Sequence, residues 1–335
     1  MRVKRVFLNE IPDWDDLIKD FAPGPYHHLA WLKAVARAYG HAPVFLLAYE
    51  GQELRGALPL VIFKGFRGKS LISLPFGDYG GPLASDEEAQ KALVFHAQKI
   101  AEEIGPLEIR FPEKPAFLPK NSGQVAKVRL LLPLPDESDD LWKALKSKVR
   151  SQVRRPMKEG AEAVVAGVEL LPAFYRIYTK TMHYLGSPPH ALSWFKSIVS
   201  FYEDKARVVM VHLKGKPLAA SIIIFSNETA TVPWAASLRE YKRISPNMLL
   251  YWQMLSLAIE KGAKIFDFGR STPGSGTYRF KKQWGAEEKA LFWYRVPAEE
   301  EKVSKVRPLI EKIWQKLPEK AANYLGPKLR GRIAL

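Results

Sequence analysis

Apolar and polar positions follow one another along the chain in an order that predicts the same elements twice. In each half, two apolar runs are joined by a short polar turn that contains a glycine, which is typical of a β-hairpin. The two predicted hairpins are residues 44–63, with a turn around Gly51, and residues 207–225, with a turn around Gly215. The pattern therefore predicts one strand–turn–strand unit in each half.

Each predicted hairpin is followed by a helical pattern and a closing apolar strand. The helices and strands are residues 86–104 with 107–111, and residues 245–261 with 263–268. Gly105 and Gly262 follow the two helices, as expected of C-caps. Strands combined with helices in this order predict mixed sheets flanked by helices, an α/β (α+β) class, and the repeat predicts two copies.

The segment between the copies is rich in proline and acidic residues, which predicts a domain boundary near residue 135. We expect an N-terminal domain over residues 1–135 and a second domain over 136–297. Residues 298–335 carry apolar side chains at helical spacing among many lysines and arginines, which predicts a basic amphipathic helical segment.

A strongly basic helix is predicted directly after this boundary. Leu141, Leu145, Val149 and Val153 recur every four residues and form its expected buried stripe, with Ser138 or Asp139 as the cap. From Trp142 to Lys158 the chain holds seven cations and no acid. A basic helix surface of this kind either binds phosphate or is simply solvated. The absence of compensating glutamate favours phosphate binding.

Composition narrows the chemistry. The net charge of +16 predicts anionic partners, and the absence of cysteine excludes disulfides, thiolate nucleophiles and cysteine-containing metal sites. The seven histidines are scattered without a ligand pattern, so we expect no metal site. No apolar run reaches the roughly 18 residues of a membrane span, and the first residues lack a signal-peptide core, which predicts a cytoplasmic protein.

Residues 266–285 carry the densest polar chemistry. A short apolar strand ends in Asp267 and Arg270, and a Pro-Gly-Ser-Gly turn then leads to Tyr278, Lys281 and Lys282. Polar groups at the end of a strand predict a ligand site. Residues 278–284 alternate as in a strand, and this periodicity alone does not choose between the two lysines.

Three further segments are candidate ligand contacts, although a turn without a ligand explains the first equally well and plain helix capping is the commoner explanation of the third. Residues 74–82 combine paired glycines with polar side chains, residues 183–190 are predicted to form a loop, and Ser245-Pro246 begins a predicted helix whose N–H groups suit an anion. The candidate contact residues in or near these segments are Asp78, Tyr79, Gly80, His183, Trp234, Arg243, Ser245 and Asn247.

Several of these motifs together resemble the Fem-type transferases. The resemblance rests on Arg150 and Arg154, on Ser245-Pro246-Asn247, on residues 267–271 and on Tyr-x-Phe-Lys-Lys-x-Trp-Gly at residues 278–285. It covers most of residues 20–330 and is nearest to FemAB-like proteins associated with exopolysaccharide and PEP-CTERM protein-sorting systems. Such proteins have two tandem GNAT-like acyltransferase domains, which agrees with the predicted duplication.

The resemblance implies transfer of an acyl or aminoacyl group onto an amine of a cell-envelope, peptidoglycan or polysaccharide precursor. The donor co-substrate would be an aminoacyl-tRNA or an acyl-CoA, with no tightly bound cofactor and no metal. A typical pyrophosphate loop is missing before residue 245, which weakens coenzyme A, and a long charged helical hairpin is missing, which weakens a conventional grip on tRNA. Both donors therefore stay open.

The resemblance also implies roles for the candidate residues. Lys281 would stabilise the oxyanion of the transition state, Arg270 would bind donor phosphate, and Asp267 would position the amine or accept its proton, unless it only bonds local backbone. The expected substrate contacts are Asp78, Tyr79, Gly80, His183, Trp234, Tyr278 and Lys282, and the expected donor contacts are Arg150, Arg154, Arg243, Ser245 and Asn247.

Two questions stay open at the level of the sequence. The framework is either that of an active transferase or that of a non-catalytic basic module that binds nucleic acid or an anionic polysaccharide. The basic segment over residues 298–335 either rests on the inner face of an anionic membrane or covers the protein's own sheet.

Overall fold

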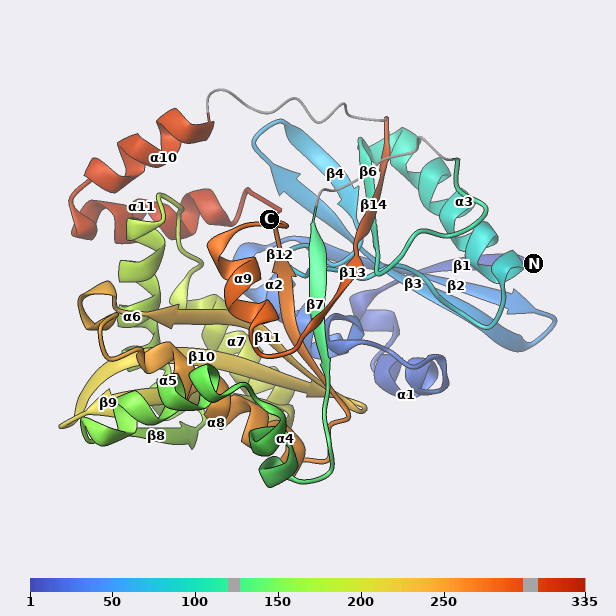
Figure 1. The fold of residues 1–335 in the computed structure, drawn as a ribbon. Coiled ribbons are helices and arrows are strands. Elements are labelled where there is room, and N and C mark those ends of the chain that lie inside the picture. The colour runs from blue at the N-terminus through green and yellow to red at the C-terminus, as the bar shows by residue number, and fades with distance from the viewer. Residues whose placement is uncertain (120–126, 298–306, 335) are drawn as a thin grey trace. The chain divides into compact units, whose positions relative to one another are not determined.

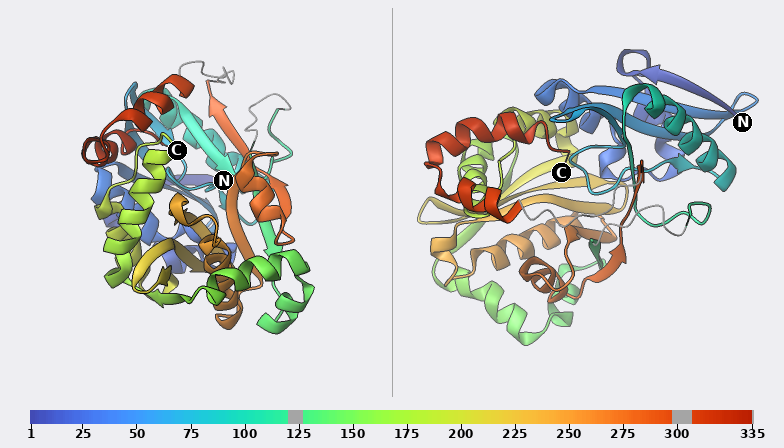
Figure 2. Two further views of the ribbon diagram at one scale, coloured as in Figure 1. Left: turned by 60° about the vertical axis from the view of Figure 1, so that its left-hand side comes forward. Right: turned by 90° about the horizontal axis from the view of Figure 1, so that it is seen from above.

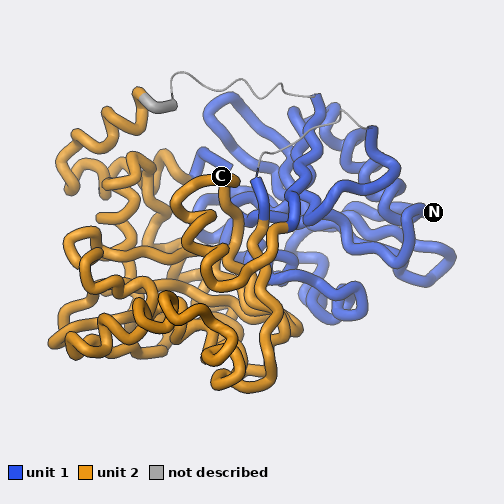
Figure 3. Tube along the Cα trace, viewed as in Figure 1, with its two compact units in different colours: residues 1–128, 289–302, 331–335 blue, residues 129–288, 303–330 orange. Residues whose placement is uncertain are grey.

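The computed structural model describes residues 1–119, 127–297 and 307–334 (Figure 1). The chain divides into two compact units, shown in different colours in Figure 3. Unit 1 comprises residues 1–128, 289–302 and 331–335, and unit 2 comprises residues 129–288 and 303–330. This division differs from the predicted boundaries, because the strand over residues 292–296 pairs within unit 1 and the helices after residue 306 pack on unit 2.

Unit 1 is a mixed sheet with helices on both faces. Its strands occur in the order β1-β2-β3-β4-β6-β14, with β5 paired to β3. The elements are β1 (Arg2–Phe7), α1 (Trp14–Ile18), α2 (Leu29–Tyr39), β2 (Ala42–Glu50), β3 (Glu53–Gly65), β4 (Gly68–Ile72), β5 (Leu83–Ala84), α3 (Glu87–Ile104), β6 (Leu107–Phe111) and β14 (Phe292–Val296).

Successive residues of β2 explain why both faces of this sheet are covered. Leu46 belongs to a buried cluster with Leu93 of α3, whereas the ring of Phe45 lies 4.6 Å from that of Trp14 in α1. Neighbouring side chains of a strand point to opposite faces, so α3 and α1 pack on opposite sides (Figure 1). Asp86 accepts a hydrogen bond from Ala89 N at 2.8 Å and caps α3.

Unit 2 repeats this plan with a larger set of elements. Its strands occur in the order β13-β7-β12-β11-β10-β9-β8. The elements are β7 (Val128–Pro133), α4 (Ser138–Ala144), α5 (Ser147–Lys158), β8 (Ala161–Ala166), α6 (Leu171–Tyr184), α7 (Leu192–Tyr202), β9 (Ala206–Leu213), β10 (Lys216–Ser226), β11 (Thr229–Ser237), α8 (Pro246–Glu260), β12 (Ile265–Ser271), α9 (Gly276–Lys282), β13 (Glu287–Ala290), α10 (Arg307–Lys316) and α11 (Glu319–Arg330).

The core of unit 2 lies between its sheet and α8. Helix α8 packs on β9 and β10, α5 packs on α8, and α6 packs on β10 and β11 from the other face (Figure 2). Leu141, Leu145, Val149 and Val153 are all buried in this core, which confirms the predicted stripe. The stripe spans two helices, because Leu145 is extended (ψ 141°) and separates α4 from α5.

The two sheets confirm the predicted duplication and fold class. Both hairpins are present, as β2–β3 and β9–β10, and both long helices, α3 and α8, run into a closing strand. The last strand of each series is exchanged, since β14 follows unit 2 in the chain but pairs with β6, and β7 follows β6 but joins the sheet of unit 2.

Two predicted secondary structures are wrong, and neither Ser138 nor Asp139 caps α4, which begins at Ser138 directly after Glu137. Residues 276–282 form the helix α9 instead of a strand, because Ser275 accepts a hydrogen bond from Tyr278 N at 3.1 Å and caps it. His183 lies in the last turn of α6 instead of a loop. The predicted basic helix near the end of the sequence is two helices, α10 and α11, separated at Leu317-Pro318, and residues 298–306 of that prediction lie outside the described residues.

Candidate functional site

The closing strand of unit 2 separates from its neighbour partway along its length. Strands β11 and β12 are parallel and pair over only three positions, from Thr229 with Ile265 to Thr231 with Asp267. Beyond these pairs, β11 continues to Ser237 and β12 to Ser271. The main chain after Asp267 is therefore not paired to β11, which makes this edge a natural place for a ligand.

Asp267 is held at the point of separation by two partners. Its Oδ2 accepts hydrogen bonds from Arg129 Nε at 3.1 Å and Nη2 at 2.8 Å, and its Oδ1 accepts one from Gly269 N at 2.8 Å. Gly269 has φ +72°, a conformation that only glycine adopts without strain, so β12 bends directly after the carboxylate. Asp267 is 1% exposed, and both of its oxygens are engaged locally.

Lys281 is carried by α9 onto the bent part of β12. Its Nζ donates hydrogen bonds to the carbonyl oxygens of Gly269 at 3.1 Å and Arg270 at 2.9 Å, and the residue is 8% exposed. A buried ammonium needs such acceptors, because losing water is costly for a charge. Lys282, the next residue, is exposed. The structure thus distinguishes the two lysines, which the periodicity of the sequence left equivalent.

Helix α9 is fixed to the core by aromatic rings. Tyr251 of α8 stacks on Phe268 at 5.6 Å and meets the edge of Phe280 at 4.9 Å. Burial raises the pKa of Tyr251, so its hydroxyl stays protonated. Tyr278 points elsewhere, since its hydroxyl donates to Glu288 Oε2 at 2.6 Å, and this bond raises the pKa of Tyr278. Lys281 is therefore set on a rigid support.

The two arginines of the basic helix have different surroundings. Arg150 Nη1 donates to the carbonyl oxygens of Trp142, Lys143 and Leu145 at 3.3, 2.9 and 3.0 Å. It therefore provides a hydrogen-bond donor for the carbonyl groups at the end of α4. Arg154 is exposed and lies over the ring of Trp142 at 5.1 Å. Arg154 presents its charge on the surface, whereas Arg150 has a local structural role.

Ser245 does not cap α8 with its side chain. It precedes the helix in a left-handed conformation (φ +58°), and its hydroxyl donates to Lys242 O at 3.4 Å. Ser245 therefore does not make the capping bond that serine commonly makes at the start of a helix, because the backbone turns its side chain away. Arg243 is exposed and Asn247 is half-buried in the first turn of α8. Their roles as donor contacts stay predictions.

His183 and Trp234 are engaged in packing within unit 2. His183 Nε2 donates to Leu317 O at 2.8 Å and connects α6 to the segment between α10 and α11. Trp234 is 9% exposed, and its ring meets those of Phe195 at 5.2 Å and Trp194 at 6.0 Å. Neither observation tests the predicted substrate contacts.

Asp78, Tyr79 and Gly80 lie in unit 1, on the loop after β4. Arg110, which is fully buried, donates to Gly77 O at 2.6 Å, and its own carbonyl accepts from Gly80 N at 2.7 Å. The Asp78 carbonyl accepts from Trp293 Nε1 at 3.1 Å. Tyr79 is 5% exposed and packs on Tyr26. The loop is thus held by its own unit, and its contact with substrate stays a prediction.

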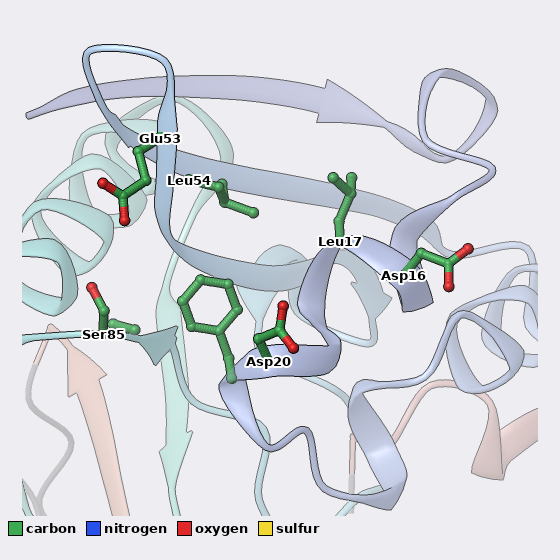
Figure 4. A pocket seen from close by; sticks show the side chains of 8 residues that line it. Asp16, Leu17, Asp20, Glu53, Leu54 and Ser85 are labelled. Atoms are coloured by element: carbon green, nitrogen blue, oxygen red, sulfur yellow. The ribbon is translucent and has the colours of Figure 1, made fainter.

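One cavity of the structure lies beside predicted site residues and another lies away from them. One of about 480 Å³ in unit 2 is lined by β7, α4 and residues 282–285, and Lys146 and Lys282 line it among apolar side chains. Another of about 660 Å³ in unit 1 is lined by Asp16, Asp20 and Glu53 with Leu17 and Leu54, and Figure 4 shows the carboxylates around it. The second contains none of the predicted site residues.

Over the described residues, the structure holds no group of three or more histidine, aspartate or glutamate side chains arranged to bind a metal ion. In the same part of the chain, no helix combines the length and the apolar character needed to cross a membrane.

Three residues with clear roles at these sites were not found from the sequence. Arg129 binds Asp267 from β7, Arg110 fills the loop of unit 1, and Ser275 caps α9. Ser275 could have been recognised as a cap, because Arg279, Lys281 and Lys282 follow where the last turn of a helix would lie. The partners of the two arginines depend on strand pairing, and Arg129 and Asp267 are 138 residues apart.

Comparison with known proteins agrees with this architecture. Residues 147–282 match the acetyltransferase (GNAT) domain family. Over 142 residues the chain is 26% identical to the lipid II:glycine glycyltransferase of Staphylococcus haemolyticus. That match covers 39% of this chain and 32% of the relative, so the chain matches about a third of the relative's length.

Solved structures share the fold over nearly the whole chain. FemX superposes with a TM-score of 0.65 at 18% identity, covering 94% of this chain and all of that one. A tandem GNAT protein from the clavulanic acid biosynthesis pathway superposes with a TM-score of 0.53 at 12% identity, covering 89% of this chain and all of that one. The matched domain, the glycyltransferase similarity and the shared fold support the resemblance to the Fem-type family, and the fold is that of two tandem GNAT-like domains.

Proposed function

We propose that the protein transfers an acyl or aminoacyl group from an activated donor onto an amine of a cell-envelope or polysaccharide precursor. The observation that carries this proposal is Lys281, whose ammonium is buried against two carbonyls of β12 where that strand has separated from β11. A fixed positive charge at an open strand edge suits a reaction in which negative charge develops on a carbonyl oxygen.

The proposed reaction needs no covalent enzyme intermediate. The neutral amine attacks the donor carbonyl carbon, a C–N bond forms, and the carbonyl electron pair moves onto oxygen beside Lys281. Collapse of this intermediate breaks the C–O bond of an aminoacyl ester or the C–S bond of a thioester. The leaving group takes the electron pair, and the proton from the amine passes to it or to solvent. Holding donor and acceptor together supplies much of the rate.

The contacts of Asp267 favour a positioning role over proton transfer. Arg129 and Gly269 N occupy both carboxylate oxygens, so both are engaged in holding the local structure. We infer that Asp267 fixes the bend of β12 and thereby the two carbonyls that hold Lys281. Arg270, half-buried on the same strand, is our candidate for donor phosphate.

The donor is anionic in both classes considered, an aminoacyl-tRNA or an acyl-CoA. The first turn of α8, the exposed Arg243 and the exposed Arg154 supply the positive groups that such a donor needs. The proposed acceptor contacts are Asp78, Tyr79, Gly80, His183, Trp234, Tyr278 and Lys282. We place the reaction in the cytoplasm, and we leave its association with an exopolysaccharide system as a prediction.

Parallel panels of acyl-CoAs and charged tRNAs, incubated with the full chain and amine-bearing amino-sugar or peptide acceptors, would test the proposal by mass spectrometry. A mass increase with charged tRNAs would assign the Fem-type donor, and one with acyl-CoAs would assign an acyl-CoA-dependent N-acyltransferase. Salt-dependent binding to nucleic acid or anionic polysaccharide without any product from either panel would overturn the proposal in favour of a binding module.

A further inference from the structure

Helix α10 exposes three large apolar side chains in one place. Leu309, Ile310 and Ile313, called here the α10 strip, are 58, 56 and 56% exposed. Residues spaced by one, three and four positions share one side of a helix, so the three side chains form a continuous strip. Proteins that stay in water seldom expose such a strip without a binding role.

The rest of α10 is anchored to unit 2. Trp314, which lies next to the strip beside Ile310, is 6% exposed, Gln315 Nε2 donates to Tyr184 O at 2.8 Å, and His183 Nε2 donates to Leu317 O at 2.8 Å. A side chain added at Gly186 would collide with Glu311, which shows how closely α10 approaches the end of α6. The helix therefore cannot turn to bury the strip without losing these contacts.

Positive charge lies directly beside the strip. Residues 307–334 contain seven lysines and arginines against two glutamates. At 100° per residue, Lys312 and Lys316 fall on the side of the strip away from Trp314, and both are exposed. An outward apolar strip bordered by lysines is the arrangement of a helix that lies in the interface of an anionic bilayer.

We propose that α10 docks unit 2 on an anionic membrane surface, with the α10 strip at the boundary of headgroups and acyl chains and with Lys312 and Lys316 at the lipid phosphates. Charge complementarity selects this occupant. A chain with a net charge of +16 is attracted to an anionic bilayer, whereas a second copy would bring two lysine-bordered strips together. The proposal is independent of the acyl-transfer chemistry.

Co-sedimentation of the full chain with two kinds of vesicle tests the proposal, one of phosphatidylcholine alone and one containing about 30% phosphatidylglycerol to supply negative surface charge. We expect binding to the anionic vesicles that weakens as salt increases. The double variant Ile310→Gln with Ile313→Gln should bind them at least about tenfold more weakly, because two apolar side chains no longer enter the interface.

Matched variants separate the apolar from the electrostatic contribution. Phe66→Gln removes an equally exposed side chain (59%) from unit 1 and should leave binding unchanged. Lys312→Gln with Lys316→Gln should weaken binding to anionic vesicles by roughly tenfold and leave the weak binding to neutral vesicles as it was. Thermal unfolding of each variant checks that the fold is retained, since all five substituted side chains are exposed.

Three outcomes would overturn the proposal. The first is no binding of the unaltered chain to anionic vesicles, and the second is equal binding by the Ile310→Gln, Ile313→Gln variant. The third is a concentration-dependent dimer in size-exclusion chromatography that this variant abolishes, which would assign the strip to a second copy. Each readout is independent of catalysis, so none is affected by the fate of the proposed reaction.

Discussion

The closing strands of the two units carry the same carboxylate–arginine pair, called here the clamp, but this pair has different surroundings in each unit. In unit 1, Glu108 of β6 accepts a hydrogen bond from Arg295 of the exchanged strand β14 at 2.7 Å. In unit 2, Asp267 of β12 accepts from Arg129 of the exchanged strand β7 at 2.8 Å. Because unit 1 has the clamp without Lys281, the repeated carboxylate–arginine pair is best explained as part of the fold, which supports a structural role for Asp267.

The cation next to the clamp marks the difference between the units. In unit 1 it is Arg110, which is fully buried and donates to Glu108, to Gly77 O and to Ala334 O, so the strand edge is filled by the unit's own chain. In unit 2 it is Lys281, which comes from α9 and bonds β12 itself. One edge is filled by its own chain, and the other is where we propose that a ligand binds. The variants below test that contrast, from the largest expected effect to the smallest.

Arg110→Met should lower the free energy of unfolding by about 3 to 5 kcal/mol, because it leaves buried acceptors and part of the Glu108 charge without a partner. Burial would raise the pKa of Glu108, but Arg110 and Arg295 hold it below its ordinary value, so this carboxyl is charged at neutral pH. Denaturant unfolding measures the change, with the exposed Arg67→Met as control. Equal stability of the two variants would contradict a structural role for Arg110.

Acid should destabilise unit 1 through His27. Burial lowers the pKa of His27 to about 4, and the neutral ring donates from Nε2 to Gly81 O at 3.0 Å and accepts from Gly24 N at Nδ1. Stability is fully present above the ordinary value of 6.5 and is lost as pH falls toward 4, by about 3 kcal/mol in total.

Unfolding free energies measured from pH 7.5 to about 4 would check this, with His27→Gln compared at each pH. The variant is expected to be less stable at neutral pH and to lose less stability in acid. Parallel curves for the two proteins would mean that other groups dominate the acid response.

Lys281→Met should reduce turnover about a hundredfold or more, equivalent to roughly 2.7 kcal/mol, if the ammonium stabilises an oxyanion. Two carbonyls lose a donor, so a loss of about 1 to 3 kcal/mol in stability is also expected. Single-turnover rates on the folded fraction separate the two effects, with the exposed Lys261→Met as control. Full activity in Lys281→Met would remove the lysine from the mechanism.

Arg154→Ala should have the smallest effect. The affinity for the donor should depend less steeply on salt concentration, by the amount expected for the loss of about one phosphate contact. Arg150→Ala should instead reduce stability by about 1 to 2 kcal/mol, since it frees the carbonyls at the end of α4. Titrations at several salt concentrations compare the two. An unchanged slope for Arg154→Ala would assign that face of α5 to solvent.

Local signals in the sequence were sufficient for the duplicated framework. Hairpin turns around Gly51 and Gly215 and the glycines after α3 and α8 are determined by a few neighbouring residues, and each was predicted correctly. The buried stripe from Leu141 to Val153 was equally readable, although the break at Leu145 was not, because it is stabilised by Arg150 from the next helix.

The site could be predicted less well because its geometry depends on distant pairing. Tyr278 and Phe280 alternate as they would in a strand, yet the cap at Ser275 and the contact of Phe280 with Tyr251 make a helix. The clamp of Arg129 and Asp267 and the position of Arg110 beside the loop at Gly77 require knowledge of which strands are neighbours. Their sequence separation gives no periodic signal.

The exchange of β7 and β14 determines how this protein can be divided. A fragment ending near residue 135 would keep β7 without the sheet it belongs to and would lack β14, so Glu108 would lose Arg295. The complementary fragment would lack Arg129 and leave Asp267 as a buried charge without its partner. The two repeats are therefore not expected to fold as separate recombinant fragments. Co-expressed halves should be soluble only when β7 can pair in the sheet of unit 2 and β14 in the sheet of unit 1.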